Sequence, residues 1–216
     1  LDVQKIRRTR RSVFATGLTL EHPFLAARVD SPNGDVLFQL DLDLDHHKSL
    51  ADHRISGVVL FPGTGYIEAA RAIGEALGMQ EIELRNGSIQ KPLVLSATEL
   101  EIMALVSPST GGARNIRFHS RLSTGDDWRT HAVFEVASSG GREMDWGTPE
   151  KASESCRNLC AVDELREKMR SIGLEYGDSF LGLREVMAGV GRAFGRIDLA
   201  EHDSLVDSTF IHPGIF

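Results

Sequence analysis

The residues best suited to chemistry are gathered in one short segment, from His53 to Gly63. The imidazole of His53 can accept a proton near neutral pH, because the reference pKa of histidine is about 6.5. Pro62 cannot extend the hydrogen-bond ladder of a strand, and Gly63 follows it where a helix is expected to begin. A backbone N–H at a helix start lies at the positive end of the helix dipole and can stabilise an oxyanion. The segment therefore predicts a general base and an oxyanion donor on one stretch of chain.

Gly57 lies between these two groups in the sequence. Because it has no side chain, it would allow a backbone segment or a ligand to approach closely. The same residues also suit a core histidine before a strand and an ordinary Pro-Gly turn into a helix. A single short motif is too loose to choose between these interpretations.

Hydrophobic periodicity predicts the elements that would position the segment. We expect helices at 64–77 and 162–172, and strands at 36–42, 55–60, 93–107, 115–123, 128–138, 183–187 and 192–199. One long helix followed by several antiparallel strands indicates an α+β fold, in which a sheet curls around the helix. The second half repeats this order in a shorter form and has no long helix of its own.

Composition excludes several classes of protein. The formal net charge of -7 argues against nucleic acid as a partner, since phosphate binding requires a basic face. No apolar run approaches the roughly 20 residues of a membrane-spanning helix, and no apolar stretch follows the basic segment 5–11, so we expect neither a membrane span nor a signal peptide. With only Cys156 and Cys160, the chain cannot form a disulfide framework, which favours the cytoplasm.

His46 and His47 lie close in sequence to His53 and to two acidic residues, Asp43 and Asp45, which raises the question of a metal site. A zinc site needs three or four ligands that converge on one point. Neighbouring side chains on a strand point to opposite faces, so at most one of the two histidines could join His53. We therefore expect no metal.

Several segments, in the same order along the chain, resemble motifs of the dehydratase domains of polyketide synthases and animal-type fatty acid synthases. The segment that begins at His53 is similar to their HxxxGxxxxP motif. The other segments are 22–25 (HPFL, similar to HPLL), 50–53 (LADH, similar to W/L-x-D-H), 62–68 (PGTGYIE, similar to PGTxYLE), 176–182 (YGDSFLG, similar to YGPxFQG) and 211–216 (IHPGIF, similar to LHPALLD). Asp178 and Leu181 depart from the family pattern, which has Pro and Gln there.

This resemblance implies a double hot-dog fold, in which two helix-in-sheet units lie side by side. It implies an N-terminal extension at 1–20, a first unit at 21–140, a linker at 141–158 and the start of an incomplete second unit at 159–216. The expected reaction removes water from a 3-hydroxyacyl thioester carried on the phosphopantetheine of an acyl carrier protein, without another cofactor. The expected partners are that carrier protein, neighbouring synthase domains and a second copy of the chain.

The resemblance also assigns roles to residues. His53 would remove the C2 proton of the thioester, and the Gly63 amide would polarise its carbonyl. Tyr176 would lie near the leaving hydroxyl, and Phe180 would shape the wall of the substrate tunnel. The expected substrate-binding residues are Gly57, Pro62, Gly63, Tyr176 and Phe180.

The general acid of the family is an Asp directly after the motif that ends here at Phe216. We expect the sequence to be an incomplete record of a longer protein, because the second unit would otherwise lack its helix; a deliberate cut and a native end are the alternatives. Asp178 is a weaker candidate for the acid. His212 is expected to set the start of the next helix rather than to react.

Three alternative functions stay open from the sequence. A double-bond isomerase or a pyran-forming cyclase would keep the histidine and differ in its tunnel contacts. A non-catalytic module would only bind carrier protein or hold a synthase dimer together. A product-template cyclase fits less well, because residues 62–64 follow the dehydratase form.

Overall fold

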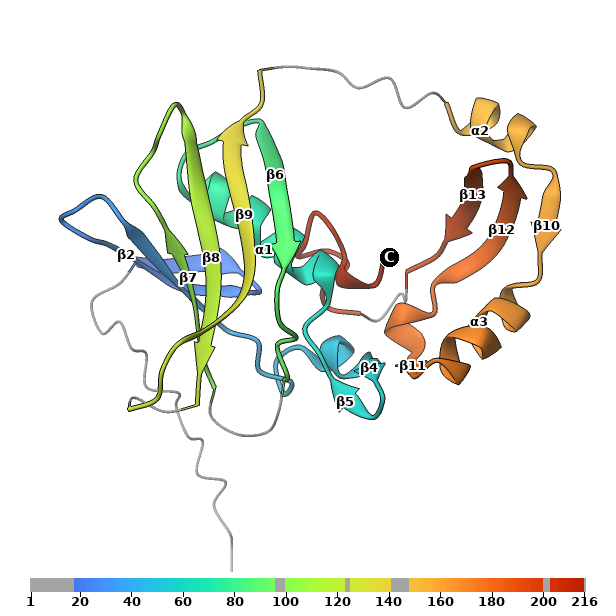
Figure 1. The fold of residues 1–216 in the computed structure, drawn as a ribbon, viewed down its shortest axis with the longest axis horizontal. Helices are drawn as coiled ribbons and strands as arrows, with labels where there is room; N and C mark the ends of the chain where they lie inside the picture. The colour runs from blue at the N-terminus through green and yellow to red at the C-terminus, as the bar shows by residue number, and fades with distance from the viewer. Residues whose placement is uncertain (1–17, 96–99, 123–124, 141–147, 200–202, 216) are drawn as a thin grey trace, which may run out of the picture.

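The structure of the chain is a computed structural model that describes residues 18–95, 100–122, 125–140, 148–199 and 203–215 (Figure 1). The basic segment 5–11, part of the expected linker (141–147) and Phe216 lie outside the described residues. Within the described ranges, no helix is long and apolar enough to span a membrane.

A seven-stranded antiparallel sheet wraps around the long helix α1 (Gly63–Ala76) (Figure 1). The spatial order of its strands is β1-β2-β3-β7-β8-β9-β6. The strands are β1 (Leu18–His22), β2 (Leu25–Asp30), β3 (Val36–Leu40), β6 (Ile82–Ile89), β7 (Glu101–Val106), β8 (Ala113–Arg121) and β9 (Arg129–Ser138). The expected α+β arrangement, with a helix inside a curled sheet, is confirmed.

Alternation along the strands explains why the sheet closes on the helix. In β7, Ile102, Ala104 and Val106 point into the core and are at most 3% exposed. They share one buried core with the apolar stripe of α1, whose Tyr66 and Ile73 are at most 1% exposed. Burying each such large side chain contributes about 1.5–3 kcal/mol, so the stripe and the strand faces specify this packing together.

The second half forms a smaller body beside the main sheet (Figure 1). Its three-stranded sheet has the order β10-β12-β13. A second small sheet, of order β11-β4-β5, joins β11 of the second half to β4 and β5 of the first half. The elements are β4 (His53–Ile55), β5 (Val58–Val59), α2 (Pro149–Ser155), β10 (Asn158–Cys160), α3 (Val162–Ser171), β11 (Leu174–Tyr176), β12 (Leu183–Gly189) and β13 (Arg192–Ile197). Short 3₁₀ helices are η1 (Lys48–Asp52), η2 (Asp178–Phe180) and η3 (Pro213–Ile215).

Two parts of the expected layout of helices and strands are wrong. The strand at 55–60 is a hairpin, because Ser56 and Gly57 adopt positive φ values of 50° and 77° and turn the chain between β4 and β5. Within the expected linker, the structure shows helix α2, which begins after Thr148; the Thr148 side chain accepts a hydrogen bond from the Lys151 N–H. Strands β1, β2 and β6 were not expected; β6 and β1 are the sheet edges, and a bulge between Arg85 and Ser88 interrupts the alternation of β6.

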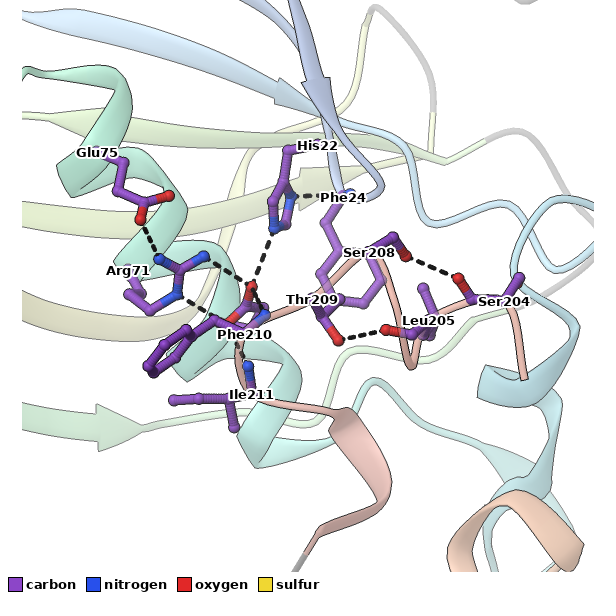
Figure 2. Close-up of polar contacts among 11 residues, drawn as sticks. His22, Phe24, Arg71, Glu75, Ser204, Leu205, Ser208, Thr209, Phe210 and Ile211 are labelled. Carbon is purple, nitrogen blue, oxygen red and sulfur yellow. Dashed lines mark hydrogen bonds and ion pairs between the residues drawn. The ribbon is translucent and has the colours of Figure 1, made fainter. Parts of the chain in front are cut away.

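A fully buried carboxylate, that of Glu68 in α1, joins three segments that are far apart in sequence. Its oxygens accept hydrogen bonds from His22 Nε2 (3.2 Å), from Arg71 (3.0 Å) and from the backbone N–H groups of Phe210 and Ile211 (both 2.9 Å). Figure 2 shows His22, Arg71, Phe210 and Ile211 converging on this point. Burial acts to raise the pKa of Glu68, but the bonds from His22, Arg71 and the two amides lower it to about 2.

Replacing Glu68 tests this junction. Glu68→Gln removes the negative charge that pairs with Arg71, so we expect the free energy of unfolding to fall by about 3 kcal/mol, as for other broken buried ion pairs. Glu75→Gln is the matched control, because Glu75 pairs with the same Arg71 but is 55% exposed, and its effect should stay below about 1 kcal/mol. Urea unfolding measures both variants, and equal losses would contradict a special role of Glu68.

The pKa of Glu68 also predicts the acid stability of the protein. Its folded-state value of about 2 lies below the ordinary 4.5, so its contribution is complete above pH 4.5 and is lost as the pH falls toward about 2. We expect urea midpoints measured across this window to fall more steeply for the native protein than for Glu68→Gln. Parallel curves would show that another group dominates the acid transition.

Candidate active site

The imidazole of His53 is half-buried, and one of its ring nitrogens is committed to the backbone. Nδ1 lies 2.8 Å from the carbonyl oxygen of Leu60, and the Leu60 N–H donates back to the His53 carbonyl at 3.0 Å. A carbonyl only accepts, so Nδ1 carries the proton and Nε2 keeps its lone pair in the neutral ring. Burial lowers the pKa of His53, with the Leu60 bond opposing the shift. At neutral pH, Nε2 is therefore available as a base.

The second half of the chain supplies two aromatic rings that enclose His53. Strand β11 pairs antiparallel with β4, and Tyr176 lies directly opposite His53 in the register. The Tyr176 ring stacks on the imidazole with centroids 5.1 Å apart at 25°, and the Phe180 ring lies at the same distance, tilted by 47°. Burial raises the pKa of Tyr176, so its hydroxyl stays protonated and can donate a hydrogen bond. The expected association of His53, Tyr176 and Phe180 is present in the structure.

The start of α1 is fixed to the same strand as the base. Pro62 is the residue before the helix and Gly63 is its first residue, so the Gly63 N–H has no acceptor within the helix. Phe61 N–H donates to the Leu93 carbonyl at 2.9 Å, which holds the chain just ahead of the helix. Because Leu60 both orients His53 and lies three residues before Gly63, the base and the helix start share one rigid support.

The segment that carries η3 packs against this helix start. The Thr64 hydroxyl donates to the Pro213 carbonyl at 2.5 Å within the core. His212 is 3% exposed, its Nδ1 accepts from the Gly214 N–H at 3.0 Å, and its Nε2 donates to Asp203 at 3.0 Å. Both ring nitrogens are used, which supports the structural role expected for His212.

Gly57 does not join this group, and its backbone conformation gives a separate reason for glycine. It lies in the exposed turn of the β4–β5 hairpin, where its N–H donates to the Glu175 carboxylate at 3.1 Å. No atom lies within 4 Å of the position that a Cβ would occupy, so close approach is not what requires glycine here. Its positive φ is the requirement instead. Asp178 is likewise exposed, at the first position of η2.

His46 and His47 were expected on a strand, but in the structure they lie just before η1. His46 Nδ1 lies 2.9 Å from the Asp41 carboxylate, and the buried His47 ring meets the Phe24 ring edge to face. The described ranges hold no group of three or more His, Cys, Asp or Glu residues placed to bind a metal ion.

A buried polar pair that the sequence did not single out holds the chain that pairs with residues 59–61, just before α1. The Ser120 hydroxyl and His131 Nε2 are 2.7 Å apart, and His131 Nδ1 donates to the Pro92 carbonyl at 3.1 Å. Both residues line a cavity of about 560 Å³. The pair anchors the chain that leads to 93–95, whose backbone bonds to 59–61. Its cross-strand partners lie on β8 and β9, so no local spacing could have revealed it.

Fold and site together define a hot-dog protein in which a half-buried, neutral imidazole faces the junction of two units. Comparison with known families agrees with this class. A model described as the polyketide synthase dehydratase domain matches residues 22–121, and one described as the polyketide synthase dehydratase N-terminal domain matches 147–216. The chain belongs to the dehydratase domains of polyketide synthases.

Individual relatives show the same relationship. The chain is 35% identical over 213 residues to the polyketide synthase GfsA of Streptomyces halstedii. This match covers 93% of the chain but only 3% of the length of that synthase. The dehydratase domain of the CurF module of curacin polyketide synthase has a TM-score of 0.81 at 26% identity, over 89% of the chain and 72% of its own. An inactive CurK dehydratase mutant, with asparagine in place of an aspartate, has a TM-score of 0.79 at 25% identity, over 89% and 70%. The double hot-dog fold is thereby confirmed.

Removing one aromatic ring tests the enclosure of His53. Phe180→Ala admits water to the imidazole, and because burial is what lowers the pKa of His53, we expect that pKa to rise toward 6.5. An NMR titration of the imidazole protons measures the change. Phe210→Ala is the control, because the Phe210 ring is 78% exposed and lies over Arg71 rather than His53. An unchanged His53 pKa in Phe180→Ala would exclude the ring as the cause of burial.

Proposed function

We propose that the protein dehydrates a 3-hydroxyacyl thioester to the 2-enoyl thioester, with His53 as the general base. The observation that carries this proposal is the Nδ1 hydrogen bond to Leu60, which leaves the basic nitrogen Nε2 of a neutral ring beside the start of α1. The proposal is also supported by the family of the chain, since it belongs to the dehydratase domains of polyketide synthases.

In the proposed reaction, Nε2 of His53 takes the C2 proton as the C2–H electron pair moves toward the thioester carbonyl. The free N–H of Gly63 stabilises the negative charge on that oxygen, with the helix dipole adding to its effect. The C2=C3 bond then forms as the C3–O bond breaks, and the hydroxyl leaves as water after it gains a proton from an acid. Tyr176 is proposed to donate a hydrogen bond near the hydroxyl, and Phe180 to shape the wall on which the acyl chain lies.

A carboxylic acid is proposed as the second proton donor. The inactive CurK mutant that lacks an aspartate supports an acid of this kind in a related dehydratase. The family motif places it directly after Phe216. The last described element, η3, packs on the start of α1 through Thr64 and so closely on Ser179 that a Cβ at Gly214 would overlap its carbonyl. We propose that the acid acts from this position, between α1 and η2.

The substrate is proposed to be carried on the phosphopantetheine of an acyl carrier protein, since the curated relatives are polyketide synthases. The elimination moves protons and no net electrons, so we propose that it uses no other cofactor. Neighbouring synthase domains and a second copy of the chain are the further proposed partners. Pro62 is proposed to contribute by setting the direction of the helix start, and Gly57 by allowing the hairpin turn that presents β4.

Replacing His53 tests the proposal in the complete protein that carries this sequence. With a 3-hydroxyacyl pantetheine thioester, we expect His53→Ala to lower kcat by about 100-fold or more, the typical contribution of a general base. In the native protein, the acid limb of the pH profile should lie below pH 6.5, because activity needs neutral His53 and burial lowers its pKa.

His46→Ala is the matched control, since it removes an exposed imidazole close in sequence and should leave turnover unchanged. Mass spectrometry of the product separates the alternatives. A 2-enoyl thioester product supports dehydration. A product with a shifted double bond would indicate isomerisation instead, and a product with a pyran ring would indicate cyclisation. Unchanged turnover in His53→Ala would overturn the proposal.

A further inference from the structure

We propose that Asp52 is a positioning residue for the base: it holds η2 in place so that Tyr176 and Phe180 enclose His53. The inference rests on the proposed role of His53 and concerns how that residue acquires its environment. Asp52 immediately precedes His53, at the end of η1. It does not contact the reacting atoms in this account and acts through its neighbours.

Two hydrogen bonds link Asp52 to the segment between the two rings. Its carboxylate oxygen Oδ2 accepts from the Ser179 N–H at 3.0 Å, and its backbone carbonyl accepts from the Gly177 N–H at 2.9 Å. Gly177 and Ser179 lie directly after Tyr176 and directly before Phe180. One residue beside the base therefore holds the chain at both positions that fix the rings.

Gly177 shows how closely the carboxylate packs on this segment. A Cβ at Gly177 would overlap the side chain of Asp52. The backbone of Gly177 has a φ of -88°, which any residue can adopt, so close approach and not backbone conformation requires glycine here. Asp52 and Gly177 both lie in segments that resemble the family motifs. The structure explains the two residues together, because the Asp52 side chain packs where a side chain at position 177 would lie.

The short helix η2 depends on this external support. It spans three residues, and its own backbone bonds are Phe180 N–H to Gly177 (2.9 Å) and Leu181 N–H to Asp178 (3.3 Å). Forming a helical turn fixes several dihedral angles for each bond gained, so isolated short helices are unstable in water. The backbone pairing of β11 with β4 ends at Tyr176, opposite His53. The bonds from Gly57 to Glu175 and from Ser56 to Gly173 lie at the hairpin turn, so neither they nor the pairing reaches η2.

The test replaces Asp52 in the complete protein and measures His53 directly. In Asp52→Ala, the Ser179 N–H of η2 loses its acceptor, the Phe180 ring separates from the imidazole, and water enters. We expect the His53 pKa to rise toward the value found in Phe180→Ala, and kcat to fall about tenfold or more with a smaller change in KM, since misplaced catalytic groups cost rate. Asp52→Asn keeps an oxygen that can accept from Ser179 and should restore both readouts.

Glu175→Ala is the matched control, because it removes another carboxylate that bonds a backbone N–H across the same junction. Its His53 pKa should stay native. If Asp52→Ala does not fold, Gly177→Ala displaces the same carboxylate from the opposite side and should raise the His53 pKa in the same direction. A native His53 pKa in a folded Asp52→Ala or Gly177→Ala protein would overturn the inference. The titration needs no substrate, so this result is separate from a failure of His53→Ala to affect turnover.

Discussion

The arrangement of the molecule depends on the buried carboxylate of Glu68. A charge without partners in the protein interior is strongly unfavourable, so Glu68 can be buried only if its donors arrive together. Those donors come from β1, from the next turn of α1 and from the chain at 210–211. Because the buried carboxylate is destabilised when any of these donors is absent, the edge of the large sheet and the C-terminal segment are held in place together. It also brings Pro213 to Thr64, and so places η3 at the start of the helix.

The site itself shows how a backbone can select the chemistry of a side chain. Leu60 contributes only its carbonyl oxygen, yet that oxygen determines which nitrogen of His53 carries the proton. Burial then lowers the pKa of His53, and the rings of Tyr176 and Phe180 lie against the imidazole. A lower pKa makes the imidazole a weaker base, and the Leu60 bond offsets part of that loss. The balance leaves a base that is unprotonated at neutral pH and shielded from bulk water.

Sequence patterns predicted the parts of the fold that repeat with a period. The stripe of α1 and the alternation of β7, β8 and β9 were visible because each buries one face in the core. The edge strands β1 and β6 were missed because solvent covers much of their surface and bulges interrupt their alternation. The hairpin at Ser56 and Gly57 resembles a single strand in sequence, because apolar residues follow the turn at once. Similarity of motifs located His53, Tyr176 and Phe180, but their stacking depends on pairing between distant strands, which local periodicity does not encode.

The pairing of β4 with β11 also has a consequence for biosynthesis. During translation, His53 leaves the ribosome with its hairpin well before residues 174–180 are made, a delay of roughly ten seconds at typical elongation rates. Over that interval the imidazole lacks both rings and remains hydrated. The reactive nitrogen reaches its final surroundings only once β11 has been added to the edge of β4. A nascent chain, or one that ends before β11, therefore carries His53 without the two rings around it. His53 acquires its final environment only after β11 has been synthesised.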